Sequence, residues 1–264
     1  MSRISLKHLR QMKVAQEKIA VLTAYDASFS YALEQAGVDV LLVGDSLGMV
    51  IQGQESTVPV SVDDIIYHTA NVIRGSDKLF VIADMPFMSY ANPDQAIKNA
   101  ARLMAEGGAQ MVKLEGGAVI IETVKQLTAR GIPVCGHLGL LPQSVHRLGG
   151  YIVQGRETAA AEELIADAIS LQEAGADMLV LECVPATLGA VVSKQLDIPV
   201  IGIGAGSDCD GQVLVVYDML GLTPGKRPRF SHDFLADTGS IQSAIASYVK
   251  SVKSGAFPNA EQQF

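Results

Sequence analysis

Short runs of apolar residues alternate with longer stretches of helical periodicity along almost the whole chain. The runs predict strands near 20–25, 40–44, 79–83, 110–115, 133–137, 177–182, 199–203 and 213–217. They are nearly continuously apolar, as strands covered on both faces usually are. The stretches between them predict helices at 27–36, 62–74, 93–107, 118–130, 158–174 and 185–196. Alternation of this kind indicates an α/β fold built around a parallel sheet.

Eight strands with intervening helices predict a closed (β/α)8 barrel, the TIM barrel. The chain has 264 residues, close to the roughly 250 that are typical of this fold. An open doubly wound sheet is the alternative, but it requires a topological switch point that the pattern does not locate. The stretch between the last two predicted strands, GAGSDCDGQ, is too short for an ordinary helix, which is the weak point of the barrel prediction.

Nothing in the composition divides the chain, because it has no Pro/Ser-rich or charge-dense linker. We therefore expect one domain over residues 1–264. Residues 1–18 are expected to form a helical cap below the barrel, with an extra helix at 2–17. Residues 233–253 predict the last helix, and 254–264 predict a mobile tail.

The overall charge gives no sign of a nucleic-acid or membrane partner. The net charge is −8 and the basic residues are scattered without a run, so nucleic acid and anionic membrane surfaces are poor candidates. The chain lacks a signal-peptide core and an apolar stretch of the roughly 18 residues that span a bilayer. Cys135, Cys183 and Cys209 lie far apart without a CxxC spacing. They predict reduced thiols in a cytoplasmic protein.

Four of the predicted strands end on an acidic residue: Asp45, Asp84, Glu115 and Glu182. A carboxylate beside buried Val, Ile and Leu is costly unless it is paired, protonated or bound to a cation. The carboxyl ends of barrel strands form the rim where barrel enzymes hold their active sites. The repetition therefore predicts an enzyme, although each acid alone could be the N-cap of the following helix.

Asp45, Asp84 and Glu115 follow neighbouring strands and predict a metal site. Three converging carboxylates repel one another unless a positive charge lies among them. Oxygen ligands without clustered Cys or His favour Mg²⁺ over zinc or copper. Lys113 shares a strand face with Glu115 and is expected to hold a substrate carboxylate. A structural ion pair is the alternative for this lysine.

Glu182 is expected to face the metal acids across the barrel mouth and to act as a general base. Pro185, in the first turn of the next predicted helix, keeps a capping role open for this glutamate. His137 is expected either to donate to a substrate oxygen or to be an ordinary core histidine. A metal, a base and a lysine together suit removal of a proton next to a carbonyl. A 2-oxo acid fits this site best, because its carboxylate and keto oxygens can chelate Mg²⁺.

Two glycine-containing connections predict ligand contacts. Residues 138–157 are long for a connector and predict a lid or a binding loop. GIGAG at 202–206 predicts a tight turn where backbone approaches a ligand, since it lacks the spacing of a dinucleotide or phosphate-binding loop.

Six strings in this order carry a family resemblance: LTAYDASFS, LLVGDSLGMVIQGQESTVPV, MVKLEGG, VCGHLGLLPQS, LVLECVP and VIGIGAG…DGQVLV. Over essentially residues 18–230, they resemble the ketopantoate hydroxymethyltransferase family. The resemblance implies a (β/α)8 barrel of the phosphoenolpyruvate/pyruvate type. It implies transfer of the one-carbon unit of 5,10-methylenetetrahydrofolate to 3-methyl-2-oxobutanoate. The product, ketopantoate, leads to pantothenate and coenzyme A.

The resemblance also implies roles for single residues. Asp45 and Asp84 would hold Mg²⁺ and contact the 2-oxo acid, and Glu115 would complete the metal shell, directly or through water. Ser46 and Lys113 would contact the substrate carboxylate. Glu182 would take the C3 proton, and His137 would lie near the product hydroxyl. A cytoplasmic homo-oligomer, commonly a decamer, is implied as well. The ending FPNAEQQF departs from the family's His-containing ending, which puts tail packing in doubt.

Two other readings remain open at this point. A related Mg²⁺-dependent carbon–carbon lyase or mutase is one, but those lyases resemble one another in a KKCGH-type loop that this chain lacks. A barrel that binds a metabolite without catalysis is the other, and such a protein would not need Glu182.

Overall fold

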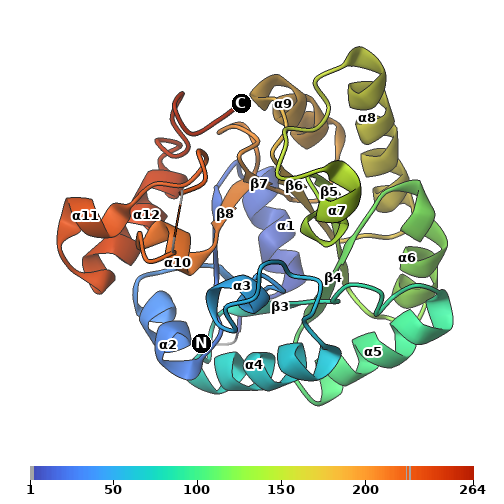
Figure 1. The fold of residues 1–264 in the computed structure, drawn as a ribbon, viewed down its shortest axis with the longest axis horizontal. Coiled ribbons are helices and arrows are strands. Elements are labelled where there is room, and N and C mark those ends of the chain that lie inside the picture. Colours follow the sequence, from blue (N-terminus) through green and yellow to red (C-terminus); the bar gives the residue numbers. More distant parts are fainter. Residues whose placement is uncertain (1–2, 224, 226) are drawn as a thin grey trace.

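The computed structural model describes residues 3–223, 225 and 227–264, and its centre is a closed barrel of eight parallel strands (Figure 1). Each strand pairs with the next, and β1 pairs with β8 to close the ring. The prediction of a (β/α)8 barrel is confirmed, and the open sheet is excluded. The strands are β1 Ile19–Thr23, β2 Val40–Val43, β3 Phe80–Asp84, β4 Met111–Glu115, β5 Val134–Gly139, β6 Met178–Glu182, β7 Val200–Ile203 and β8 Gly211–Leu214.

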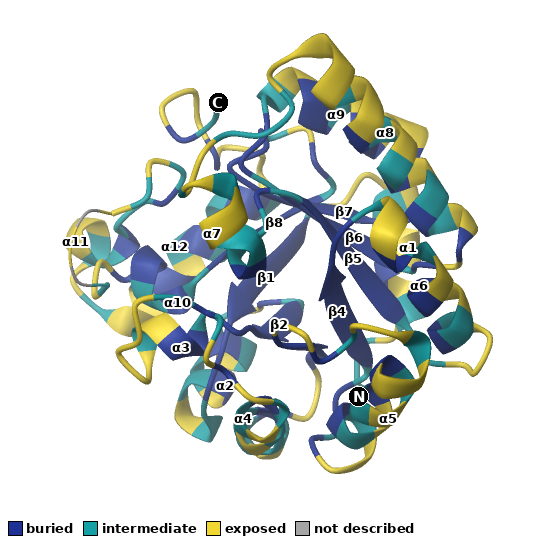
Figure 2. Cartoon of the chain, turned by 45° about the vertical axis from the view of Figure 1, so that its right-hand side comes forward, coloured by how far each residue is buried: buried dark blue, intermediate teal, exposed yellow. Residues whose placement is uncertain are grey.

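Helices surround the barrel, and their inner sides pack on buried strands while their outer sides are exposed (Figure 2). The longer ones are α1 Leu6–Val14, α2 Ala27–Gln35, α4 Val62–Gly75, α5 Pro93–Ala105, α6 Ile121–Thr128, α8 Thr158–Glu173, α9 Ala186–Gln195 and α12 Ile241–Lys253. The short ones are α3 Leu47–Val50, η1 Ala118–Ile120, η2 Pro142–Ser144, α7 Val145–Leu148, α10 Val216–Met219 and α11 Phe234–Thr238.

Several predicted boundaries are wrong. The last helix, predicted at 233–253, is two helices, because Gly239 adopts a φ of +75° and ends α11. The strand predicted at 213–217 begins instead at Gly211. A Cβ there would lie 2.3 Å from the carbonyl oxygen of Ile19, so only glycine allows β8 to approach β1. The helix predicted at 118–130 is the turn η1 followed by α6.

The barrel closes at the β1–β8 seam, and α12 lies against it. The hydroxyl of Tyr248 lies 2.9 Å from both the carbonyl oxygen of Val21 on β1 and that of Gln212 on β8. Tyr248 is fully buried and packs edge-on against Phe234 and Phe257. One side chain from the last helix therefore bridges the first and last strands.

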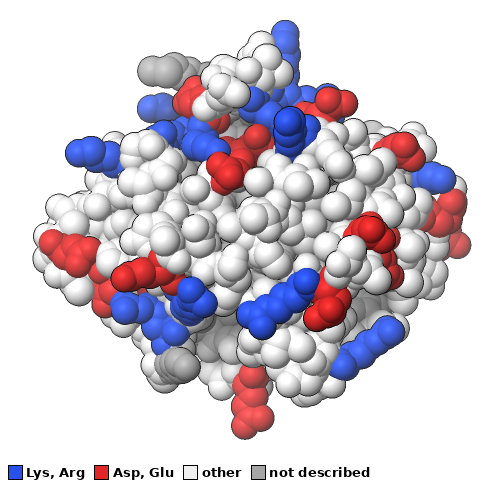
Figure 3. All heavy atoms as spheres, turned by 90° about the horizontal axis from the view of Figure 1, so that it is seen from above, with Lys and Arg blue, Asp and Glu red and all other residues white. Residues whose placement is uncertain are grey.

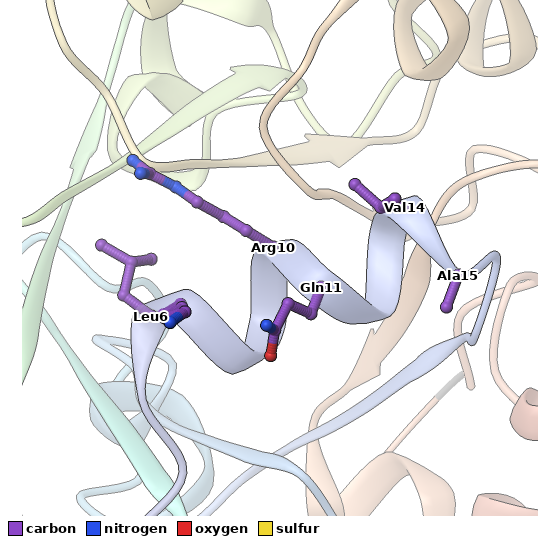
Figure 4. A pocket seen from close by; sticks show the side chains of 6 residues that line it. Leu6, Arg10, Gln11, Val14 and Ala15 are labelled. Carbon is purple, nitrogen blue, oxygen red and sulfur yellow. The ribbon is translucent and has the colours of Figure 1, made fainter.

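The helix α1 lies below the barrel, at the amino-terminal ends of the strands. Lys13 Nζ contacts Asp210 Oδ2 at 2.7 Å, and Arg10 pairs with Asp177; these aspartates directly precede β8 and β6. Figure 4 shows Leu6, Arg10 and Val14 on one side of α1, where they line a hollow of about 410 Å³. The predicted extra helix is present but shorter than the 2–17 expected.

Part of the segment 254–264, for which the sequence predicts a mobile tail, contacts the rest of the molecule. Phe257 is buried. The main-chain oxygen of Phe264 accepts a hydrogen bond of 2.8 Å from the backbone N–H of Ala186, and the Arg229 guanidinium lies over the Phe264 ring at 5.3 Å. Two aromatic residues hold this segment, which is otherwise small and polar.

The outer surface carries no large region of one charge on the face shown in Figure 3, where Lys/Arg and Asp/Glu lie in small mixed groups. Within residues 3–223, 225 and 227–264, no helix is long and apolar enough to cross a bilayer.

Candidate active site

The four predicted acids lie on one rim of the barrel. Asp84, Glu115 and Glu182 are the last residues of β3, β4 and β6, and Asp45 follows β2 by two residues. Because the strands are parallel, their carboxyl ends meet at the same end of the barrel. Asp45, Asp84 and Glu115 are buried, whereas the side chain of Glu182 is 12% exposed at the mouth.

Lys113 provides a positive charge inside this group of acids. Its Nζ lies 2.6 Å from Asp84 Oδ1, and both side chains are almost fully buried. The other oxygen, Asp84 Oδ2, accepts a hydrogen bond of 3.0 Å from the backbone N–H of Asp45. Burial acts to lower the pKa of Lys113, but the charges of Asp84, Glu115 and Asp45 outweigh burial and raise that pKa. The lysine therefore stays charged.

His137 lies between Glu115 at the end of β4 and Glu182 at the end of β6. Its Nδ1 lies 3.3 Å from Glu115 Oε1, and its Nε2 lies 3.3 Å from Glu182 Oε2. Burial and Lys113 act to lower the pKa of His137, but the two glutamates raise it to about 9. A protonated Nδ1 cannot accept from Lys113 Nζ, which lies 3.3 Å away, so the contact with Glu115 is the favourable one.

The carboxylates are not fully compensated by Lys113 and His137. Burial, together with the charges of Asp84 and Glu115, raises the pKa of Asp45 well above its ordinary value. Burial also raises the pKa of Asp84, against the opposing effect of Lys113. Asp84 Oδ1 is paired with Lys113 Nζ, and Glu115 Oε1 lies beside His137 Nδ1, so each of these buried oxygens already has one charged neighbour. The site therefore holds more buried carboxylate charge than these contacts offset, which would favour a further cation.

The acidic side chains do not form a closed metal site. In the described part of the chain, no three Asp, Glu, His or Cys side chains are grouped so that they could hold an ion. Asp84 is paired with Lys113, and Asp45 Oδ2 accepts a hydrogen bond from Gln143. Mg²⁺ commonly binds one or two carboxylates and completes its octahedron with water and substrate. Asp45 and Asp84 fit that kind of open site.

Gln143 is a site residue that the sequence did not reveal. Its Nε2 donates to Asp45 Oδ2 at 2.9 Å and to the Met85 carbonyl at 3.0 Å. Its backbone N–H donates to Glu115 Oε2 at 3.1 Å, and its Oε1 accepts from the hydroxyl of Tyr90 at 2.6 Å. The GHLGLLPQS motif pointed to this segment, but contacts to residues so distant in sequence have no local signal.

Ser46 also has a partner that the sequence did not reveal. Its Oγ lies 2.8 Å from the hydroxyl of Tyr25, which is buried just after β1. A Cβ at Gly44 would lie 2.9 Å from Ser46 Oγ and 3.3 Å from Asp84 Oδ2. Glycine at position 44 therefore leaves the space in which serine and aspartate side chains can face the same mouth.

Backbone hydrogen bonds from two neighbouring segments fix the turn that follows Glu182. Cys183 has a φ of +48°, a left-handed conformation that is uncommon for a non-glycine residue. Its N–H donates to the Ile203 carbonyl and its carbonyl accepts from the Gln154 N–H, both at 2.9 Å. The predicted tight turn at GIGAG is also present, with positive φ at Gly204.

The cysteines are unpaired in the structure, as the sequence predicted. Cys135, Cys183 and Cys209 are all buried. Burial raises the pKa of each thiol above its ordinary value. None of them is therefore poised to act as a thiolate nucleophile.

Comparison with solved structures supports the fold of the barrel. A phosphoenolpyruvate phosphomutase from Streptomyces platensis subsp. rosaceus is similar with a TM-score of 0.63 and 13% identity, over 83% of each chain. A phosphonopyruvate hydrolase solved in complex with oxalate and Mg²⁺ gives a TM-score of 0.63 and 13% identity, over 99% of this chain and 93% of that one. At such identity, the likeness concerns the fold alone.

Comparison of sequences identifies the family. The family model described as ketopantoate hydroxymethyltransferase matches residues 3–260. A protein of Nitrosococcus oceani named 3-methyl-2-oxobutanoate hydroxymethyltransferase is 64% identical over 264 residues, which is the whole of both chains. The chain therefore belongs to the ketopantoate hydroxymethyltransferase family, a family of enzymes.

Proposed function

We propose that this enzyme transfers the one-carbon unit of 5,10-methylenetetrahydrofolate to 3-methyl-2-oxobutanoate through an enolate, giving ketopantoate for pantothenate synthesis. The observation that supports this mechanism best is the position of Glu182. Glu182 lies on the opposite side of His137 from Glu115, and each of the two glutamates has an oxygen 3.3 Å from a nitrogen of the imidazole. A base and an oxygen-rich site therefore face one mouth.

Asp45 and Asp84 would hold Mg²⁺, and Glu115 would complete the shell directly or through water. The phosphonopyruvate hydrolase of similar fold binds Mg²⁺ together with oxalate, a small dicarboxylate, which is compatible with this assignment. When bound, Mg²⁺ supplies Lewis-acid stabilisation of the negative charge that develops on the substrate oxygen. The burial of Asp84 and Glu115 close to Asp45, where their charges raise the pKa of Asp45, supports these residues as ligands.

Lys113 and Ser46 would bind the substrate carboxylate. The lysine is charged and carries three N–H donors, of which its contact with Asp84 uses only part. Ser46 has its hydroxyl held by Tyr25 at 2.8 Å. The two side chains would fix the 2-oxo acid so that its C3–H points across the mouth toward Glu182.

Glu182 would remove the C3 proton. A positioned base typically contributes about 10²–10⁴-fold in rate, roughly 3–5 kcal/mol. The enolate carbon would then form a bond to the methylene carbon of the folate. Over the whole reaction, water supplies the new hydroxyl and tetrahydrofolate leaves. His137, which lies beside Glu182, would contact that hydroxyl.

The exchange of the C3 proton in D₂O tests this proposal in the wild-type enzyme. We expect the C3 signal of 3-methyl-2-oxobutanoate to disappear from the proton NMR spectrum when enzyme and Mg²⁺ are present. Exchange should need no folate and should stop when a chelator removes the metal. Exchange that requires folate, or that continues unchanged in chelator, would contradict an enolate formed with help from a metal.

Gln143→Ala is expected to weaken Mg²⁺ binding about 10–100-fold, the usual effect of removing a group that orients a metal ligand. The variant loses the donor to Asp45 and the partner of Tyr90. Isothermal titration calorimetry with Mg²⁺ measures this directly, and exposed Gln11→Ala on α1 is the matched control. Equal Mg²⁺ affinity in both variants would show that Gln143 does not position the aspartate.

We also propose that residues 1–264 fold as one domain and that the enzyme is a cytoplasmic homodecamer. The oligomer and the location are supported by the family resemblance alone. The long segment 138–157 would act as a binding loop, since Gln143 within it reaches both Asp45 and Glu115.

A further inference from the structure

A polar pocket of about 460 Å³ lies outside the group of acids that the reaction uses. The segment after α10 and the C-terminal segment form it together. The polar side chains that line it are those of Arg227, Arg229, Ser231, His232, Glu261 and Gln262. We call it the arginine pocket after Arg227 and Arg229, which line it.

The two segments that form the arginine pocket contact the rim of the barrel near Glu182. Phe264 accepts a hydrogen bond from Ala186, the first residue of α9, and the carboxyl terminus lies beside α9 in Figure 1. A Cβ at Gly204 would lie 3.0 Å from atoms of both Phe230 and Phe264. Gly204 directly follows Ile203, which pairs with Glu182. The pocket therefore borders the β6–β7 side of the mouth.

The guanidinium of Arg229 is already oriented. Its Nε donates to the carbonyl of Glu261 at 3.0 Å, and its plane lies over the ring of Phe264. Its two terminal nitrogens make no hydrogen bond to any residue that the structure describes. A guanidinium held in this way presents paired donors that match a carboxylate. Less side-chain entropy is then lost when a ligand binds.

Arg227 is accessible to a ligand as well. It forms a long ion pair with Asp233, with Nη1 3.6 Å from Oδ2, and its side chain is 49% exposed. His232 is paired with Asp237 at 2.6 Å. Among the described residues that line the pocket, Glu261 is the acidic one. Two arginines two residues apart therefore suit an anion with more than one carboxylate.

We propose that the arginine pocket binds the carboxylates of the glutamyl tail of the folate co-substrate. The proposal rests on the proposed function, which places the reacting carbon of the folate over Glu182. Folate is elongated, with its glutamate at the opposite end from the ring system that carries the one-carbon unit. When that ring system lies over the mouth, the tail extends outward across the rim. The arginine pocket is a polar, cationic site at that edge.

Calorimetric titration with tetrahydropteroyl monoglutamate and triglutamate tests this assignment. The wild type should bind the triglutamate more tightly. Arg229→Ala should weaken triglutamate binding by about tenfold or more, since it removes a charged, paired contact. Arg227→Ala should also reduce the preference for the triglutamate over the monoglutamate. Arg229→Lys should retain part of the affinity for the triglutamate. Arg130→Ala is the matched control, because Arg130 is exposed at the opposite end of the barrel, before β5.

Two outcomes separate this inference from the proposed mechanism. If Arg227→Ala and Arg229→Ala bind both folates as the wild type does, the arginine pocket is not the tail site. Exchange of the C3 proton involves no folate, so it tests the acid site independently in the same preparations. Absence of exchange in the wild type, with the triglutamate preference still dependent on the arginines, would overturn the mechanism and leave the pocket assignment standing. Arg227 pairs with Asp233, whereas Arg229 donates to the Glu261 carbonyl, so the Arg227 variant leaves that contact to the C-terminal segment in place.

Discussion

Glu182→Gln is expected to slow exchange of the C3 proton of 3-methyl-2-oxobutanoate by about 10²–10⁴-fold or more, the usual contribution of a positioned base. Glutamine has nearly the same shape but cannot accept the proton as a carboxylate does. The rate is measured by proton NMR in D₂O with Mg²⁺ present. Formation of ketopantoate should fall by a similar factor, because the enolate precedes carbon–carbon bond formation.

The control for this prediction is Glu162→Gln, which makes the same chemical change on the exposed side of α8 and should leave exchange unaltered. The amide at position 182 can still contact His137, whose Nε2 lies 3.3 Å from the present carboxylate. The variant should therefore stay folded and bind Mg²⁺ like the wild type. Undiminished exchange with Gln at position 182 would remove this residue from the role of base.

Lys113→Met is expected to lower the free energy of unfolding by about 3–5 kcal/mol, the range observed when one partner of a buried ion pair is removed. Methionine preserves most of the volume but leaves Asp45, Asp84 and Glu115 without the ammonium group. Urea denaturation followed by circular dichroism measures the change. Lys98→Met on α5, where the lysine is exposed, is the matched control.

Added Mg²⁺ should stabilise the Lys113→Met variant more than it stabilises the wild type. A divalent ion would supply the positive charge that the lysine supplies now, and a ligand that binds only the folded state raises its stability. Thermal unfolding with and without Mg²⁺ compares the two proteins. If Lys113→Met lowered the free energy of unfolding no more than Lys98→Met does, the acids would have to be neutralised by other groups.

The sequence predicted the barrel and the chemical nature of its rim because both depend on local patterns. An apolar run that ends on an acid identifies the strand and the end of the barrel at which its side chain lies. Asp84, Glu115 and Glu182 each occupy the last position of a strand in the structure. Once the strands are in order, the barrel topology brings these side chains together without further information.

The remaining parts of the site depend on contacts between distant residues. Gln143 reaches Asp45 across 98 positions of sequence, and nothing in a polar residue after a proline indicates that partner. The sequence left His137 open as a core residue or a site residue, and its two contacts with glutamates become visible only in the folded barrel. The start of β8 was missed because Gly211 resembles a loop residue until the proximity of β1 is known.

The contact of Tyr248 with both seam strands has a consequence for biosynthesis. The tyrosine hydroxyl lies 227 positions along the chain from the carbonyl of Val21 that it contacts. During translation, β1 therefore leaves the ribosome long before β8 and Tyr248 are synthesised. Until then the first strand keeps an unpaired edge, and edges of that kind are where polypeptides associate wrongly. Chaperone protection during translation should matter most for the amino-terminal segment of this enzyme.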